Sequence, residues 1–339
     1  MGRRGRRILV GVLLAGLLLA GGLALVWQHY QQFLGTPLKL PEEGLVVEIA
    51  GGETAARVAA RLESQGVLGD ARLLRFHLRL HPELGRIKAG EYLLEPGLTP
   101  VGLLELLVSG RTRMHEITFP EGWTFRQWRQ AMDRHPALKH LLTGLSDAEV
   151  MERLGHPGAH PEGRFFPDTY LFPKGFTDLE LLRRAYRRME EELAAAWESR
   201  AKDLPLESPD ELLILASIVE KETARPEERQ QIAGVFVRRL RRGMKLQTDP
   251  TVIYGMGERY RGNIRRSDLR EDTPYNTYVH AGLPPTPICM PGRAALLAAA
   301  NPAPGKALYF VARGDGSHHF SSSLKEHNRA VRKYQLKKR

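Results

Sequence analysis

The first hydrophobic feature of the chain is an unbroken apolar run. Residues from Ile8 to Trp27 include no charged or strongly polar side chain. At about 1.5 Å per residue, a helix of about 20 residues spans the roughly 30 Å hydrocarbon core of a bilayer. The pattern predicts a transmembrane helix over residues 8–27. It leaves residues 1–7 as a tail and residues 28–44 as a tether that contains glycine and proline.

A small unit with strand and helix patterns follows over residues 45–110. Leu45–Ile49 and Ala89–Leu94 have the composition of strands. Between them we expect one helix capped by Thr54 and a second helix over Ala71–Leu80. This order of strand, helix, helix and strand resembles a LysM-type carbohydrate-binding module.

The rest of the chain mixes helices with polar loops. Residues 111–205 are predicted to form a mostly helical connecting region, interrupted by an aromatic loop at Glu162–Tyr170 that either carries binding groups or fills a gap in the packing. Residues 206–339 alternate helices with polar loops and contain a predicted hairpin at Leu308–Phe320. The fold class is therefore α+β, with a single N-terminal transmembrane helix, a small LysM-like βααβ module and a mixed α/β catalytic domain.

One carboxylate of the last region falls on the apolar side of a predicted helix. The helix starts at Ser208, which forms a capping-box pattern with Glu211. At about 100° per residue, Glu220 lies about 20° from Leu213 and about 40° from Ala216. Burial among these side chains raises the pKa of a carboxyl group, so Glu220 is a candidate general acid.

Two observations qualify this candidate. A carboxylate at the edge of an apolar stripe also fits an ion pair with an arginine, which perturbs its pKa as well. Glu222 is two residues further on, so its side chain diverges from that of Glu220 by about 200°. The two carboxylates therefore cannot act together on one substrate atom from this helix alone.

The formal net charge of +11 does not by itself indicate nucleic acid. Arg238–Arg239 and Arg241–Arg242 are expected on a solvated helix face, and no nucleic-acid motif or aromatic platform accompanies them. We expect anionic lipids and carboxylate-bearing wall polymers as counter-charges instead. The remaining basic clusters lie at the two ends of the chain: Arg3, Arg4, Arg6 and Arg7, then Lys333, Lys337, Lys338 and Arg339.

The arginines before the apolar run also predict its orientation. Positive charge favours the cytoplasmic side, so the amino terminus is expected in the cytoplasm and the catalytic part outside it. A cleaved signal peptide is the alternative, although the run ends without a clean small-x-small site. The single Cys289 forms no internal disulfide, and nothing near it in the sequence supplies a base for a nucleophilic role.

Six ordered motifs are more specific than any one of them. Together they resemble the signature of the YceG-like (MltG) endolytic murein transglycosylases, and the likeness extends over nearly the whole chain. The motifs are Leu215–Thr223, Leu246–Thr251, Tyr275–Tyr278, Gly282–Pro287, Gly316–Phe320 and Glu326–Asn328.

The resemblance implies an activity. The family cleaves the β-1,4 bond between N-acetylmuramic acid and N-acetylglucosamine in nascent peptidoglycan strands without water and leaves 1,6-anhydromuramyl ends. It implies a carboxylate acid/base at the position of Glu220, no cofactor and a place on the inner (cytoplasmic) membrane. Peptidoglycan synthases become candidate partners.

The resemblance also implies substrate-binding groups, for some of which a structural role is the alternative. Asp249 could instead form a turn before its proline, and His318 could simply satisfy a hairpin. His318, His319 and His327 do not have metal-ligand spacing, so no metal is expected. The expected substrate-binding residues are Glu222, Gln247, Asp249, Asn276, Tyr278 and His318.

Two other functions stay open from the sequence. A muramidase-type hydrolase would need a second carboxylate near Glu220, for which Asp249, Asp168 and Glu162 are candidates. A non-catalytic wall-binding scaffold would bind glycan through the LysM-like module and would not cut it.

Overall fold

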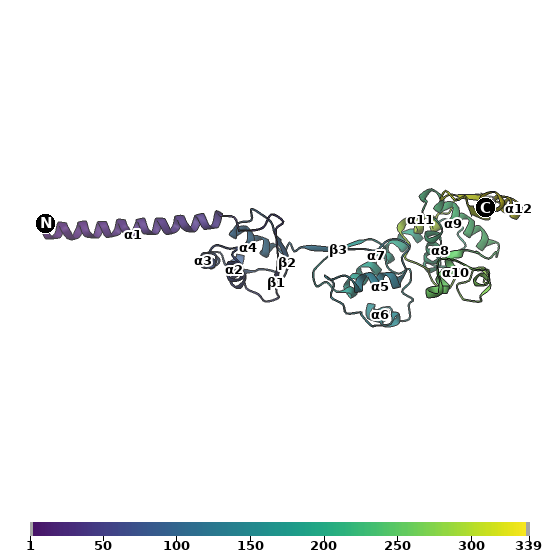
Figure 1. Ribbon diagram of the computed structural model, residues 1–339, viewed down its shortest axis with the longest axis horizontal. Helices are drawn as coiled ribbons and strands as arrows, with labels where there is room; N and C mark the ends of the chain where they lie inside the picture. The colour runs from purple at the N-terminus through teal and green to yellow at the C-terminus, as the bar shows by residue number, and fades with distance from the viewer. Residues whose placement is uncertain (1–2, 337–339) are drawn as a thin grey trace. The chain divides into compact units, whose positions relative to one another are not determined.

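The computed structural model describes residues 3–336, which divide into two compact units (Figure 1). The first unit runs to His115 and includes Phe172–Lys174. The second contains Glu116–Leu171 and the chain from Gly175 onward. The first unit holds the apolar N-terminal helix and the small module, and the second holds most of the expected chemistry.

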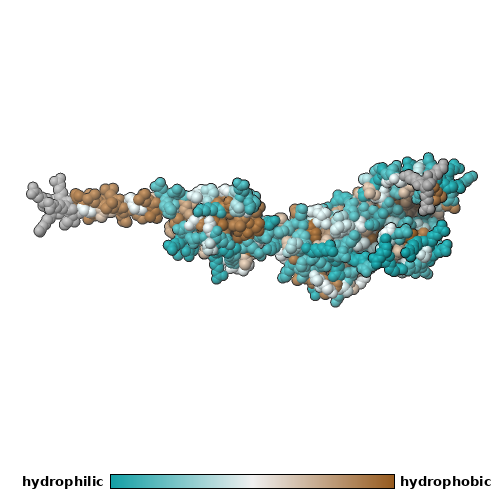
Figure 2. All heavy atoms as spheres, in the orientation of Figure 1, coloured by the Kyte–Doolittle hydropathy of each residue, from teal (hydrophilic) through white to brown (hydrophobic). Residues whose placement is uncertain are grey.

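The N-terminal helix α1 spans Arg3–Gly35. Its segment Val10–Gly35 is long and apolar enough to cross a membrane, a property that an N-terminal signal sequence shares. Figure 2 shows hydrophobic atoms along this helix.

The end of α1 differs from the expected tether. Tyr30 is only 4% exposed, its hydroxyl hydrogen-bonds to Nδ1 of His77 at 2.6 Å, and Leu38 is buried as well. The apolar side chains at the end of the helix meet the core of the module. Residues 28–44 therefore pack onto the module instead of forming a free spacer.

The module is built on two antiparallel strands, β1 (Leu45–Ile49) and β2 (Gly90–Leu94), in which Leu45 pairs with Leu94. The predicted order of strand, helix, helix and strand is confirmed. Its likeness to LysM stays a prediction. The other elements are α2 (Ala55–Ser64), α3 (Ala71–Leu80), the 3-10 helix η1 (Pro82–Gly85) and α4 (Pro100–Ser109).

The second unit is organised around helix α8, Pro209–Glu222. All side chains over residues 212–219 are buried. The helix packs against α7 (Asp178–Glu198), α9 (Pro226–Arg241) and α11 (Arg293–Ala300). The sequence predicts one apolar stripe on this helix. Because other elements surround α8 on all sides, it has no solvated face over residues 212–219.

The start of α8 is as predicted at its cap. The side chain of Ser208 accepts a hydrogen bond from the backbone N–H of Glu211 at 3.3 Å. The carboxylate of Glu211, however, accepts from the backbone N–H of Glu207 at 2.6 Å. The capping residue is therefore confirmed, while the acidic residue satisfies the N–H one position earlier than a capping box requires.

The C-terminal part agrees with the sequence in its hairpin and differs in one loop. Strands β5 (Tyr309–Ala312) and β6 (His318–Ser321) pair antiparallel, as predicted. The expected polar loop 246–251 instead leads directly into α10, Asp249–Met256. Pro250 fits the first turn of this helix. The N–H groups of a first turn have no partner within the helix, so the N–H that proline lacks is not missed there.

The remaining elements connect these parts. Strands β3 and β4 pair with each other, and one end of each belongs to the first unit. The remaining elements are β3 (Met114–Thr118), α5 (Phe125–Asp133), α6 (Asp147–Leu154), β4 (Thr169–Pro173), η2 (Gly257–Arg259), η3 (Asp268–Arg270), α12 (Leu324–Val331) and the terminal π-helix η4 (Arg332–Leu336).

We predict that Gly163→Ala destabilises the chain more than Gly158→Ala does. Both glycines have φ near +80°, so alanine adds a similar backbone cost at each of about 1–2 kcal/mol. A Cβ at position 163 would lie 2.5 Å from Cβ of Pro287, whereas a Cβ at position 158 meets nothing within 4 Å. Overpacking should add about 1–3 kcal/mol for Gly163→Ala. Urea unfolding of both variants measures the difference, and equal losses would show that the contact with Pro287 carries no strain.

Candidate functional site

A cavity of about 460 Å³ lies at the C-terminal end of α8 and brings together most of the predicted binding residues. Its wall also includes an arginine and several side chains of the C-terminal hairpin. Carboxylates, an amide, a phenol and an imidazole around one cavity are suited to hydrogen-bond a sugar chain. The polar residues that line it are Glu222, Arg239, Gln247, Asp249, Tyr278 and His318.

Glu222, the last residue of α8, is the carboxylate of the cavity wall that burial perturbs most. Burial and, to a smaller extent, the charge of Asp249 raise the pKa of Glu222 to about 7. The hydroxyl of Thr248 donates a hydrogen bond to Oε1, and the charges of His318 and Arg239 oppose the rise. Near neutrality this carboxyl group therefore carries a proton in a large fraction of molecules.

Arg239 is held rigidly beside this carboxyl group. Its Nε donates to the carbonyl of Leu308 and its Nη1 to the carbonyl of Leu246, both at 2.7 Å. The expectation of a solvated face was wrong for this residue, because its side chain is buried. Its position in the sequence gave a usable signal. Arg239 follows Ile232 by seven residues and therefore lies on the apolar side of α9.

The backbone of the site is strained at Gln247. Among the residues that the structure describes it is the one non-glycine with a positive φ, at +50°. Its backbone N–H donates to the carbonyl of Thr277 at 3.1 Å, which fixes the turn. Strained residues of this kind persist where the surrounding structure holds them, and here the strain directs a side chain into the cavity.

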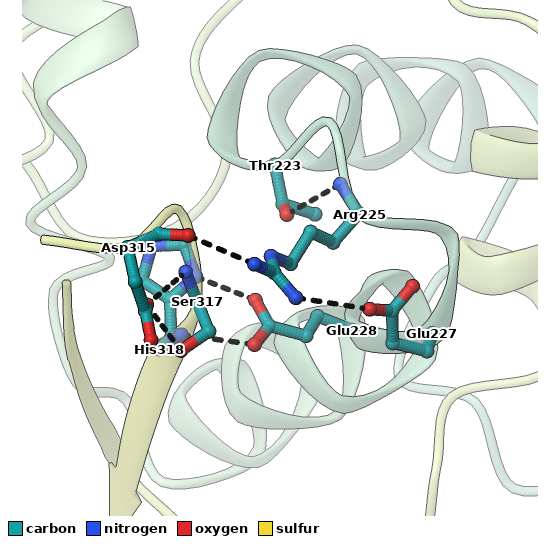
Figure 3. Close-up of polar contacts among 7 residues, drawn as sticks. All are labelled: Thr223, Arg225, Glu227, Glu228, Asp315, Ser317 and His318. Atoms are coloured by element: carbon teal, nitrogen blue, oxygen red, sulfur yellow. Dashed lines mark hydrogen bonds and ion pairs between the residues drawn. The ribbon is translucent and has the colours of Figure 1, made fainter. Parts of the chain in front are cut away.

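His318 is oriented by a buried carboxylate on α9 (Figure 3). Glu228 accepts a hydrogen bond from the backbone N–H of His318 at 2.9 Å and lies 2.7 Å from its Nδ1. Because the carboxylate is an acceptor, Nδ1 carries the proton of this bond. The turn before His318 is fixed by Arg225, which donates to the carbonyl of Asp315 at 2.8 Å.

The motif Tyr275–Tyr278 divides into one cavity residue and one support. The hydroxyl of Tyr278 donates to Oδ1 of Asp249 at 2.6 Å, and both side chains line the cavity. Asn276 is fully buried away from it. Its amide donates to the carbonyls of Asp268 and Glu271, and its Oδ1 accepts from the N–H of Tyr278. Asn276 therefore supports the loop that carries Tyr278, and its contact with substrate stays a prediction.

Glu220 is not among the residues that line this cavity. Its side chain is 6% exposed, and burial raises its pKa, so the predicted desolvation is confirmed. The arginine pair is present too, since Nη2 of Arg229 lies 3.4 Å from Oε1. The backbone N–H of Gly292 donates to Oε2 at 3.0 Å. The second carboxylate that acts on Glu220 is Glu121, which none of the sequence motifs indicated.

Glu162 faces a separate cavity of about 990 Å³. It accepts hydrogen bonds from the backbone N–H of Phe125 and the hydroxyl of Tyr254, both at 3.0 Å, and burial raises its pKa to about 7. The aromatic residues that follow it are buried, with Phe165 stacked on Phe125. The loop Glu162–Tyr170 is thus both a packing plug and the source of one perturbed carboxyl group.

The other candidates from the sequence lie elsewhere. Asp168 lines a third cavity together with arginines of α7. Cys289 is buried, its thiol donates to the carbonyl of Ser217, and burial raises the pKa of that thiol, which opposes nucleophilic reactivity. Over residues 3–336, no three histidine, cysteine or acidic side chains are grouped so that they would share a metal ion.

Comparison with known proteins places this geometry in a family. The model of the YceG-like family matches residues 47–333, and the chain therefore belongs to that family. A protein of Bacillus subtilis named endolytic murein transglycosylase is 32% identical over 85% of this chain and 84% of its own length. A protein of the same name from Streptococcus pneumoniae is 28% identical over 93% of this chain, which spans 62% of that longer relative.

A solved structure is similar as well. The crystal structure of a YceG-like protein from Listeria monocytogenes matches with a TM-score of 0.53 and 29% sequence identity. The match covers 85% of this chain and 99% of that one. The similarity in structure thus extends over nearly the same length as the similarity in sequence.

We predict that Glu162→Gln stabilises the chain at alkaline pH. Because the pKa of Glu162 rises from 4.5 to about 7 on folding, the folded chain holds a proton that the unfolded chain has released between these values. Stability therefore falls as pH rises through this window, by about 3 kcal/mol in total. The variant loses this penalty, so its advantage should be small at pH 5 and large at pH 8.

Urea unfolding at the two pH values measures this advantage. Glu190→Gln, at an exposed position on α7, is the matched control and should show no such change with pH. An advantage of Glu162→Gln that is the same at both pH values would contradict the assignment.

Proposed function

We propose that this chain is a membrane-anchored endolytic murein transglycosylase. Membership of the YceG-like family and the names of its relatives support the activity. The observation that carries the proposal is the desolvated carboxyl group of Glu222 in the wall of a polar cavity, with a pKa raised to about 7. Such a group can give a proton to a leaving oxygen at neutral pH and take one back afterwards.

The proposed reaction needs one acid/base group. Glu222 protonates the oxygen of the β-1,4 bond between N-acetylmuramic acid and N-acetylglucosamine. The C6 hydroxyl of the muramyl sugar attacks its own anomeric carbon as that bond breaks, and the carboxylate then accepts the C6 proton. The product is a 1,6-anhydromuramyl end. Attack from within the sugar has a high effective concentration, so no activated water is required.

The geometry favours Glu222 over Glu220 as this group. Both carboxyl groups are desolvated, but Glu222 lines the cavity together with Gln247, Asp249 and His318. Glu220 is engaged by the N–H of Gly292 and the guanidinium of Arg229, two donors that stabilise its ionised form. Burial raises the pKa of Glu220 as well, so the prediction that Glu220 is the acid stays a prediction and Glu220 is the alternative acid/base.

One observation favours a second function. Asp249 lines the same cavity as Glu222 and accepts a hydrogen bond from Tyr278, so a pair of carboxylates faces the substrate space. A muramidase-type hydrolase would use Asp249 to activate a water molecule or stabilise the sugar cation. The two reactions differ in their products, because hydrolysis leaves reducing muramyl ends.

The first unit would place this chemistry at the membrane. In this proposal α1 is an uncleaved anchor whose N-terminus lies in the cytoplasm, and the cavity acts on the outer side. The module of residues 45–110 would bind glycan in the manner of LysM. Nascent strands then lie within reach of the anchored enzyme.

We predict that Glu222→Gln lowers the rate of glycan cleavage by about 10²- to 10⁴-fold, because the amide cannot transfer a proton. Mass spectrometry of purified strands treated with each variant counts the anhydromuramyl ends. Glu220→Gln is the matched control from the same helix and should retain most of the activity.

Thermal unfolding of both variants shows whether either has lost its fold. If Glu220→Gln abolishes cleavage in a folded chain and Glu222→Gln does not, the roles of the two residues are reversed. Reducing ends from the wild-type chain would favour the hydrolase.

We also predict that kcat/KM, which reports the pKa values of the free enzyme, falls as pH rises above about 7. The reactive form of Glu222 is protonated, so its loss on titration removes the general acid. Asp249→Asn removes a charge that raises the pKa of Glu222 and should move this alkaline limb to lower pH. Glu162→Gln, in the other cavity, should leave the limb in place. If Asp249→Asn leaves the alkaline limb at the same pH, a group other than Glu222 titrates there.

A further inference from the structure

The exposed side of helix α3 combines aromatic, aliphatic and basic residues. On its inner side Leu74 and His77 are buried in the module. On its outer side Phe76 is 44% and Leu80 is 51% exposed, which is unusual for large apolar residues in one small helix. Three exposed arginines share this side, within about 140° around the helix axis. The outer set is Arg72, Arg75, Phe76, Arg79 and Leu80.

This side of α3 is continuous with the end of the apolar helix. The ring of Phe76 contacts that of Tyr30, with ring centroids 5.4 Å apart, and Tyr30 in turn lies 5.4 Å from Trp27. Tyr30 also hydrogen-bonds to His77 of α3. In Figure 1, α3 lies at the end of the module from which α1 leaves. The position of Phe76 relative to the apolar segment is therefore fixed by contacts.

The distances place Phe76 at the level of lipid headgroups. Trp27 ends the apolar run, and tryptophan at that position marks a membrane interface. Tyr30 follows three residues later, about 4.5 Å further along the helix axis. The headgroup region on each side of the hydrocarbon core is roughly 5–7 Å thick. A ring that contacts Tyr30 therefore lies within that layer when α1 spans the bilayer.

We propose that the outer side of α3 is a lipid-binding surface that docks the module on the same membrane that α1 spans, with anionic phospholipid as its ligand. Phe76 and Leu80 enter the interface, and the arginines contact the phosphates. Aromatic and basic residues on one side of a helix are the composition of interfacial helices. The inference rests on the proposed membrane anchor and is independent of the catalytic residues.

Depth-dependent fluorescence quenching tests the inference on the full chain. An environment-sensitive label is attached to the cysteine of Phe76→Cys. Native Cys289 is buried, and the wild type without the introduced cysteine gives the background signal. The chain is reconstituted in vesicles of equal parts phosphatidylglycerol and phosphatidylcholine that carry lipid quenchers. Leu18→Cys, in the apolar run, reports insertion of α1. Leu93→Cys, at an exposed position on β2 of the same module, is the matched control away from α3.

We expect the label at position 76 to be quenched strongly by headgroup quenchers and the label at position 93 weakly. Quenching at position 18 with none at position 76 would overturn the lipid-binding surface while leaving the anchor intact. No quenching at position 18 would refute the anchor itself, and the inference with it.

Charge reversal tests the ligand. Each arginine near an anionic surface favours contact by about fivefold, so reversal of Arg72, Arg75 and Arg79 to glutamate should lower quenching at position 76 by at least tenfold. The matched control reverses three exposed arginines of the same unit outside α3: Arg57, Arg86 and Arg111. An equal effect of the two triple variants would show that only the overall charge matters. Full quenching in pure phosphatidylcholine would show that the anionic lipid is not required.

Discussion

The structure depends on the burial of α8, a helix surrounded on all sides over residues 212–219 whose end carries two glutamates. Burial of its apolar residues stabilises the second unit, and the same burial removes water from the carboxyl groups that follow. Glu220 and Glu222 diverge by about 200°, so each meets a different environment: Glu220 meets Arg229 and a backbone N–H, and Glu222 meets the polar cavity. One helix therefore supplies two desolvated carboxyl groups in different surroundings.

The polar groups of the cavity are held by partners outside it. Arg239 is fixed by carbonyl oxygens, His318 by Glu228, and Tyr278 by the support of Asn276 on its backbone N–H. The backbone strain at Gln247 persists only because this framework surrounds it. Preorganised groups of this kind need little rearrangement when charge develops on a sugar during bond cleavage, which is where such a framework contributes most to catalysis.

Local signals in the sequence predicted the elements well, and tertiary neighbours decided what the sequence could not. The cap at Ser208, the two strands of the module and the C-terminal hairpin follow from residue type and spacing, which act over a few residues. The helical pattern correctly buried Glu220, but it compares a residue only with others on its own helix. Glu222 contacts a segment distant in sequence, because the hydroxyl of Thr248 donates a hydrogen bond to it. The support that Asn276 gives to the loop of Tyr278 likewise depends on contacts that its spacing in the sequence does not indicate.

The proposed chemistry depends on a proton that Glu222 keeps near neutral pH in the folded chain. Infrared difference spectra between the wild-type chain and Glu222→Gln isolate the carboxyl signal of this one residue. We expect a protonated-carboxyl band that is present at pH 6 and disappears as pH rises through about 7. A difference spectrum that shows only the ionised carboxylate at pH 5, well below that value, would contradict this expectation.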